Sequence, residues 1–105
     1  MYIVIGTDTY LKQLKKWSAG EREIASKLPL ELKGNPYSGK PLNYRFLREK
    51  KVREKRIYYL VYDDLKLVLL VATSQKKDQQ ATIDHIKSKF KEFRTVAEDI
   101  SRQVS

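Results

Sequence analysis

Residues 44–73 constrain the fold most, because they contain three consecutive segments with the pattern of β-strands. Residues 56–62 alternate two sets of side chains with a period of two, which is typical of a strand. Asp63 and Asp64 follow as a turn, since both side chains can bond nearby backbone groups. Residues 65–72 are almost entirely apolar, as in a strand that is buried on both faces. The sequence therefore predicts a small, mainly antiparallel sheet.

The connection between the first two of these strands is strongly basic. Residues 44–56 contain seven lysines and arginines and two glutamates, a net +5 of the formal +9 of the chain. A uniform excess of Lys and Arg can simply keep a protein soluble. Concentration of the charge in one hairpin instead favours a polyanionic partner, either nucleic acid or an acidic protein.

Length and composition exclude several classes of protein. With 105 residues we expect a single domain over residues 1–105. No cysteine and one histidine leave little from which to build a disulfide, a thiolate or a zinc site, so we expect no metal and no cofactor. No apolar run approaches the roughly 18 residues of a membrane span, and no signal peptide is visible. We expect a cytoplasmic protein without membrane contact.

The first third of the chain predicts one strand and two helices. Residues 2–5 fit a short interior strand. Trp17 shares one side of the first helix with other apolar residues, so we expect it in the core. Ser18 and Glu21 match a capping box that begins the second helix. Pro29 should kink or shorten that helix, because it removes a backbone donor and clashes with the preceding turn.

The last third carries the clearest helical pattern. Apolar residues recur at alternating spacings of three and four at Ile83, Ile86, Phe90, Phe93, Ala97, Ile100 and Val104. We expect one helix over about residues 78–103, roughly 38 Å long, that extends beyond a compact core of about 13 Å radius. Residues 97–104 should then meet a partner chain, such as a second copy in a homodimer, or fray.

This order of elements, with a basic first hairpin, resembles the RelE/ParE superfamily of small toxins from toxin–antitoxin pairs. The residues that carry the resemblance are 35–42, 44–48, 56–59 and 67–77, within about residues 2–90. The resemblance implies a RelE-like α+β fold, β-α-α-β-β-β-α. In that fold an N-terminal helical hairpin packs on a small, mainly antiparallel sheet, followed by a long C-terminal helix. Residues 35–41, between the helices and the sheet, read as a turn-rich linker.

RelE-like members cut mRNA in the ribosomal A site, whereas ParE-like members poison gyrase. The resemblance to the first branch implies a ribosome-dependent mRNA endoribonuclease, in which a ribose 2′-hydroxyl attacks the adjacent phosphate. It also implies a cognate antitoxin and mRNA on the ribosome as partners. Two alternatives stay open. One is a non-catalytic or ParE-like toxin that targets gyrase or another protein, and the other is a basic RNA- or DNA-binding module.

The family pattern also suggests site residues. Arg56 corresponds to the arginine that opens the third strand, and is the first candidate for a phosphate clamp because guanidinium donates two parallel hydrogen bonds. Arg48, on the second strand, and Lys77, after the last strand, complete the expected catalytic set, which holds the phosphate and neutralises developing charge. The neighbouring cations expected to bind RNA are Arg45, Lys50, Lys51, Arg53 and Lys76.

The sequence departs from the family at the expected C-terminal tyrosine. The position six residues past Lys77 is Ile83. His85 could serve as an acid or base, but it points away from the packed side of the helix, so we expect it to be exposed. The nuclease hypothesis therefore requires the arginines and lysines around the hairpin to converge in one pocket that holds a phosphodiester.

Overall fold

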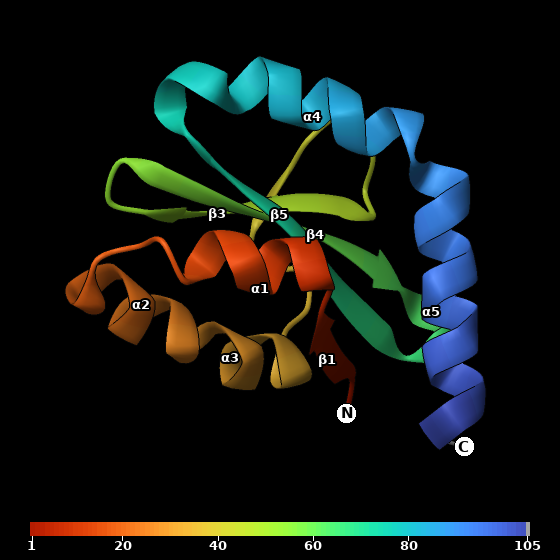
Figure 1. The fold of residues 1–105 in the computed structure, drawn as a ribbon. Coiled ribbons are helices and arrows are strands. Elements are labelled where there is room, and N and C mark those ends of the chain that lie inside the picture. Colours follow the sequence, from red (N-terminus) through yellow and green to blue (C-terminus); the bar gives the residue numbers. More distant parts are fainter. Residues whose placement is uncertain (105) are drawn as a thin grey trace.

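A five-stranded sheet lies at the centre of the molecule, with helices on both of its faces (Figure 1). The computed structural model describes residues 1–104. The strand order is β1-β5-β4-β3-β2. The strands are β1 (Ile3–Gly6), β2 (Lys40–Pro41), β3 (Leu47–Val52), β4 (Lys55–Tyr62) and β5 (Leu67–Gln75). β1 pairs with β5 in parallel and the other pairs are antiparallel, which confirms the predicted mainly antiparallel sheet.

The three strands predicted within residues 44–73 are β3, β4 and β5. The predicted turn between the last two is a short 3-10 helix, η1 (Asp63–Leu65). As expected, β5 is buried on both faces over its first seven residues. β2 lies inside the segment that we expected to be only a linker. Two residues are too few for an alternating pattern, so no pattern along the chain predicts this edge strand.

Three short helices follow β1, namely α1 (Asp8–Leu14), α2 (Ala19–Ser26) and α3 (Leu28–Gly34). The predicted capping box is present, because the Ser18 hydroxyl accepts from the backbone of Glu21 and the Glu21 carboxylate accepts from the backbone of Ser18. α2 ends and α3 begins next to Lys27, with Pro29 in the first turn of α3. Pro29 thus divides the second predicted helix, as its chemistry requires.

A first hydrophobic core lies between these three helices and the sheet. Ile57, Tyr59 and Val61 of β4 belong to it, together with Leu32 of α3. Trp17 belongs to this core and is 6% exposed, which confirms its predicted place. The hydroxyl of Tyr59 accepts a hydrogen bond from the backbone of Gly39 at 3.0 Å, so the phenol also anchors the segment before β2.

A second core covers the opposite face, where α4 (Gln79–Ser88) and α5 (Phe90–Val104) pack on the sheet. Ile83 and Ile86 of α4 and Ala97 of α5 are buried there among leucines of β3, β4 and β5. The seam of apolar residues predicted for the C-terminal segment therefore faces the sheet, apart from Val104 at its end, which is exposed. None of the helices described is long and apolar enough to cross a lipid bilayer.

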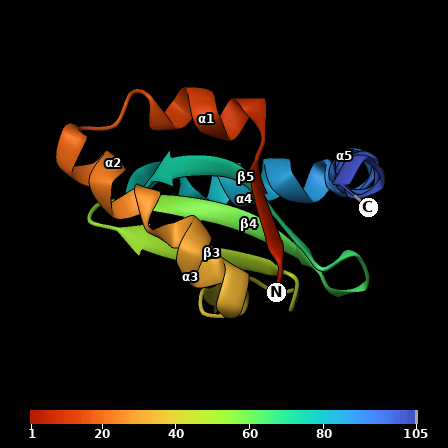
Figure 2. The same cartoon turned by 90° about the horizontal axis from the view of Figure 1, so that it is seen from below.

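The prediction of one long C-terminal helix is wrong, because the helix breaks at Lys89. The backbone there has φ −114° and ψ 14°, outside the helical range, and the Lys89 amide donates to the carbonyl oxygen of Ile86 at 3.0 Å. Figure 2 looks along the axis of α5 while α4 lies side-on, so the two helices run in different directions. Because of the break, Ile86 of α4 and Ala97 of α5 are both 0% exposed against the same sheet. The molecule stays compact, with a radius of gyration of 12.9 Å.

Candidate functional site

Two adjoining hollows share Lys40 of β2. One lies toward the short helix η2 (Lys76–Asp78) and the start of α4, and the other lies toward β3. The first, the amide hollow, has a volume of ≈ 530 Å³ and is lined by Lys40, Pro41, Leu42, Asn43, Lys76, Lys77, Gln79, Gln80 and Ile83. The second, the edge hollow, has a volume of ≈ 380 Å³ and is lined by Ser38, Gly39, Lys40, Glu49, Lys50 and Lys51. Lys40 lines both hollows, so five lysines surround one continuous surface. Such a surface attracts phosphate.

Glu49 is the one carboxylate among the described residues that line the two hollows. It lies on β3 and is 5% exposed. Its Oε2 accepts a hydrogen bond from Nε2 of Gln79 at 2.6 Å, and its Oε1 lies 3.6 Å from Nε of Arg56. Because Gln79 lines the amide hollow and is the first residue of α4, this bond links the two hollows and ties β3 to α4.

Arg56 lies below the surface of the site rather than in solvent. It is 5% exposed on β4, and its Nη1 donates to the backbone oxygens of Lys55 at 3.1 Å and Arg53 at 3.4 Å. Its Nε is buried and forms no hydrogen bond with the part of the chain that is described, although it faces Glu49. In this arrangement Arg56 supports the carboxylate of Glu49, and it is not an exposed phosphate clamp.

Two other arginines of the expected set lie elsewhere. Arg48 donates to the backbone oxygens of Gly39 at 3.0 Å and Tyr37 at 2.8 Å, which fixes the segment between α3 and β2. Arg45 pairs with Asp63 at 3.2 Å and stacks over the ring of Tyr37, with its Cζ 4.0 Å from the ring centroid. The guanidinium groups of the expected arginines therefore do not converge in one hollow, so the part of the nuclease hypothesis that concerns the arginines is wrong.

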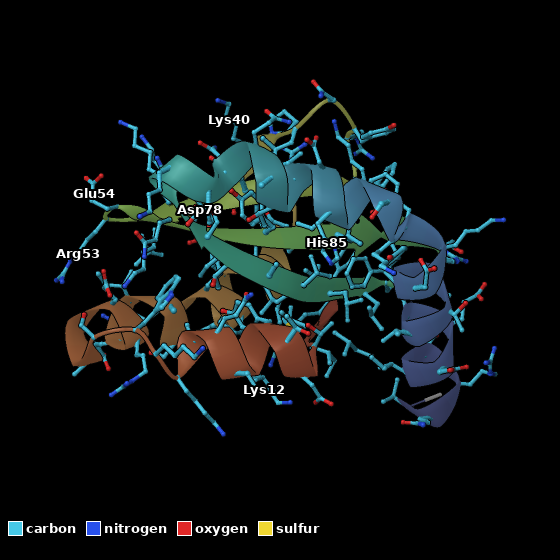
Figure 3. The ribbon with its side chains drawn as sticks, turned by 45° about the horizontal axis from the view of Figure 1, so that its top comes forward. Lys12, Lys40, Arg53, Glu54, Asp78 and His85 are labelled. Carbon is cyan, nitrogen blue, oxygen red and sulfur yellow. The ribbon has the colours of Figure 1, made fainter. Side chains whose placement is uncertain are left out.

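The expected lysines are closer together than the arginines. Lys76 and Lys77 line the amide hollow, and Lys50 and Lys51 line the edge hollow. Lys50 also pairs with Glu31 of α3, with 2.5 Å between Nζ and Oε2. Arg53 lies apart from them at the tip of the β3–β4 hairpin, where its φ is 56° (Figure 3). The cationic site is thus built mainly from lysines.

Groups that could transfer a proton are scarce near the hollows. Burial raises the pKa of Tyr58, which is 0% exposed and whose hydroxyl lies 2.8 Å from that of Ser74, so it stays a neutral phenol near pH 7. Ile83, at the position of the expected tyrosine, is 7% exposed and packs in the second core. His85 is exposed, as predicted, and lies farther along α4 than the hollows (Figure 3). Glu49 is therefore the candidate proton acceptor.

Sequence reasoning missed Glu49, Lys40 and Gln79. Alternation along β3 puts Glu49 on the same side as Lys51, and pairing of Lys51 with Arg56 brings that arginine close to Glu49. A lone acid among cations in a strand is the signal that could have identified Glu49. Lys40 and Gln79 carried no such signal, because their place depends on the edge strand β2 and on the start of α4.

No protein-family model matches this sequence, and no curated protein matches it. Solved structures do match the fold. A mutant of E. coli toxin RelE with two arginines replaced by alanine, in the free state, has a TM-score of 0.69 at 20% identity, covering 83% of this chain and 96% of that one. A chain of the intact E. coli RelBE toxin–antitoxin complex has a TM-score of 0.63 at 22% identity, covering 71% and 96%. A chain of the toxin–antitoxin complex RelBE2 from Mycobacterium tuberculosis has a TM-score of 0.62 at 20% identity, covering 70% and 96%. The chain therefore has the RelE fold, as the sequence predicts.

Proposed function

We propose that this chain is a RelE-like toxin that acts in the cytoplasm and cleaves mRNA on the ribosome. The proposal rests on one observation above all. On a RelE fold, five lysines surround two contiguous hollows whose single described carboxylate is Glu49. Cations of this density suit the phosphates of a single RNA strand, and a carboxylate among them suits proton transfer.

The lysines supply binding and charge stabilisation. Lys51, Lys76 and Lys77 are exposed and can each donate hydrogen bonds to non-bridging phosphate oxygens. Their charge offsets the negative charge that develops on those oxygens when a fifth oxygen approaches phosphorus. This distributes among lysines the role that we expected of a cluster of arginines.

The proposed reaction starts from the ribose 2′-hydroxyl. Its oxygen forms a bond to the adjacent phosphorus while its proton passes to Glu49, and the bond from phosphorus to the 5′-oxygen breaks. The departing 5′-oxygen takes a proton from a lysine ammonium group or from water, leaving a 2′,3′-cyclic phosphate and a 5′-hydroxyl. Gln79 must release Glu49 for this step, since it covers the carboxylate at 2.6 Å. Arg56 is a positioning residue that holds Glu49 from beneath.

The test is cleavage of a defined mRNA on ribosomes by purified protein. Glu49→Gln keeps the size of the side chain and an acceptor for Gln79, but it removes both the proton acceptor and the charge that pairs with Arg56. The rate of Glu49→Gln protein that circular dichroism shows to be folded should fall by about 10²–10⁴. Lys12→Gln is the matched control, because Lys12 is exposed on α1 on the opposite side of the molecule from Lys40 (Figure 3). Equal rates for Glu49→Gln and wild type, with folding verified by circular dichroism, overturn the assignment of Glu49. Intact mRNA with folded wild-type protein overturns the nuclease proposal.

A second candidate is a non-catalytic or ParE-like toxin that binds gyrase or another protein. The observation that favours it is the apolar Ile83 at the position of the expected tyrosine, together with the burial of Arg56. Under this alternative, induced expression stops growth while mRNA stays intact, and signs of DNA damage appear if gyrase is the target. A plain RNA- or DNA-binding module instead permits growth.

We also propose a cognate antitoxin as partner. Several of the solved structures with this fold contain an antitoxin, and the +9 charge of the chain favours an acidic partner. A homodimer through α5 is a further proposal, since Val96 and Val104 leave exposed apolar surface on that helix. Sedimentation equilibrium of the isolated chain tests it, and a monomer at all concentrations excludes it.

A further inference from the structure

The lining of the amide hollow combines three kinds of side chain. Three lysines line it together with the side-chain amides of Asn43 and Gln80, and Leu42 and Ile83 add an apolar surface. The volume of ≈ 530 Å³ lies within the range of about 300–1,000 Å³ that small-molecule sites have. A site for phosphate alone needs neither amides nor apolar walls, so the hollow has features that binding the RNA backbone leaves unexplained.

Side-chain amides are suited to reading a nucleobase. Each amide offers a donor and an acceptor side by side, and such a pair matches the amino group and ring nitrogen of adenine. Single-stranded RNA is read in this way, with the base turned out, hydrogen-bonded at its edge and packed on side chains. Leu42 and Ile83 can pack against the faces of a base, as apolar side chains do.

The amides of the hollow are not equally available. Nε2 of Gln79 already donates to Glu49 at 2.6 Å, and Nε2 of Gln80 donates to Asp84 at 2.9 Å. The Asn43 side chain is exposed and forms no hydrogen bond with the part of the chain that is described. Its φ of 69° lies in the left-handed region, which asparagine tolerates better than most residues. Asn43 is therefore the free donor–acceptor pair of the hollow, with the Oε1 atom of Gln80 as a further acceptor.

We infer that the amide hollow is a nucleobase subsite that selects adenine next to the cleaved phosphate, with Asn43 and Gln80 as the specificity-determining residues. The inference deepens the proposed function and rests on it. The lysines that line the hollow hold the phosphates on either side of the nucleotide, and the base enters the hollow between them. The link from Gln79 to Glu49 places this base beside the candidate proton acceptor.

The experiment maps every cut in a mixture of mRNAs on ribosomes and compares adenine with the other bases at the position next to the cut. Wild type should cut next to adenine at least about tenfold more often than next to guanine or uracil, as one good bidentate contact provides. Asn43→Ala should reduce this ratio to near one, and Gln80→Ala should lower it. Asn35→Ala changes an exposed asparagine that lines neither hollow and should keep the wild-type ratio.

Unchanged ratios in Asn43→Ala, or a wild type without a preference for adenine, overturn the inference while leaving the nuclease proposal intact. If wild type cuts nothing, the nuclease proposal fails, and binding tests the subsite separately. Fluorescence anisotropy with oligoadenylate and oligouridylate of equal length should then show about tenfold tighter binding of adenylate, lost in Asn43→Ala. Equal affinity for the two oligomers contradicts the inference.

Discussion

The pair formed by Arg56 and Glu49 gives a sharp prediction about stability. The side chains are 6% and 5% exposed, and Nε of Arg56 lies 3.6 Å from Oε1 of Glu49. Removing one partner of a buried ion pair leaves an uncompensated charge and costs about 3–5 kcal/mol. A domain of this size has a free energy of unfolding of about 5–15 kcal/mol. Arg56→Ala should therefore lose a large part of the total stability.

Urea denaturation measures this effect. With a slope of roughly 1.5 kcal/mol per molar urea, the loss moves the midpoint of unfolding down by about 2–3 M. The matched control is the double variant Glu49→Leu with Arg56→Met, because apolar residues of similar volume can replace a buried ion pair at little cost. Its midpoint should lie above that of Arg56→Ala and closer to wild type, because no buried charge is left unpaired. The double variant still loses the hydrogen bond from Gln79 and the two that Arg56 donates to the backbone.

Two results would refute this reasoning. One is a wild-type midpoint in Arg56→Ala, which would mean that Arg56 is free to act directly on substrate. The other is a double variant as unstable as the single variant. The prediction also affects activity assays, because an inactive Arg56→Ala protein must be shown to be folded before its loss is attributed to catalysis.

Three further outcomes follow from particular contacts. Gly39→Ala should lower the free energy of unfolding by about 1–3 kcal/mol, because the added Cβ would lie 2.7 Å from a backbone oxygen of β3. The control Gly34→Ala, whose added Cβ has no atom within 4 Å, should change the free energy of unfolding by under about 0.5 kcal/mol. The hydrogen bond from Lys55 lowers the pKa of Glu21 from 4.5 to about 2. The contribution of ionised Glu21 to stability is therefore complete above pH 4.5 and is lost as the pH falls through 2. Glu21→Gln should make the acid side of the stability profile flatter, and an unchanged profile contradicts this. Lys77→Ala should reduce the slope of log affinity for single-stranded RNA against log salt by about 0.7. The control variant Lys12→Gln should leave this slope unchanged.

The sheet could be predicted because its signals are local. Alternation in residues 56–62 and the apolar run that follows fix two strands, and both are present as β4 and β5. The break at Lys89 could not be predicted, since the spacing of apolar residues continues through it from Ile86 to Phe90. Neither proline nor glycine marks the break. Packing of both helices on one sheet produces it, and that packing is a tertiary effect.

The site was harder to predict than the fold. Of the expected cations, Lys50 and Lys51 of the basic hairpin and Lys76 and Lys77 after β5 line the hollows. The burial of Arg56 depended on the strand register, which brings Glu49 to it. Charge counts along a sequence cannot distinguish a cation that faces solvent from one that is neutralised by an acid on the neighbouring strand.

The most direct test of the central proposal replaces one ribose in the mRNA. Purified protein is incubated with ribosomes that carry either an all-ribose mRNA or the same mRNA with a single 2′-deoxyribose immediately 5′ of the mapped cut. We predict that the first is cut, with a 2′,3′-cyclic phosphate at the new end, and that the second stays intact at that position. Equal cutting of both, or cutting of neither by folded protein, contradicts attack by a 2′-hydroxyl at the lysine-lined site.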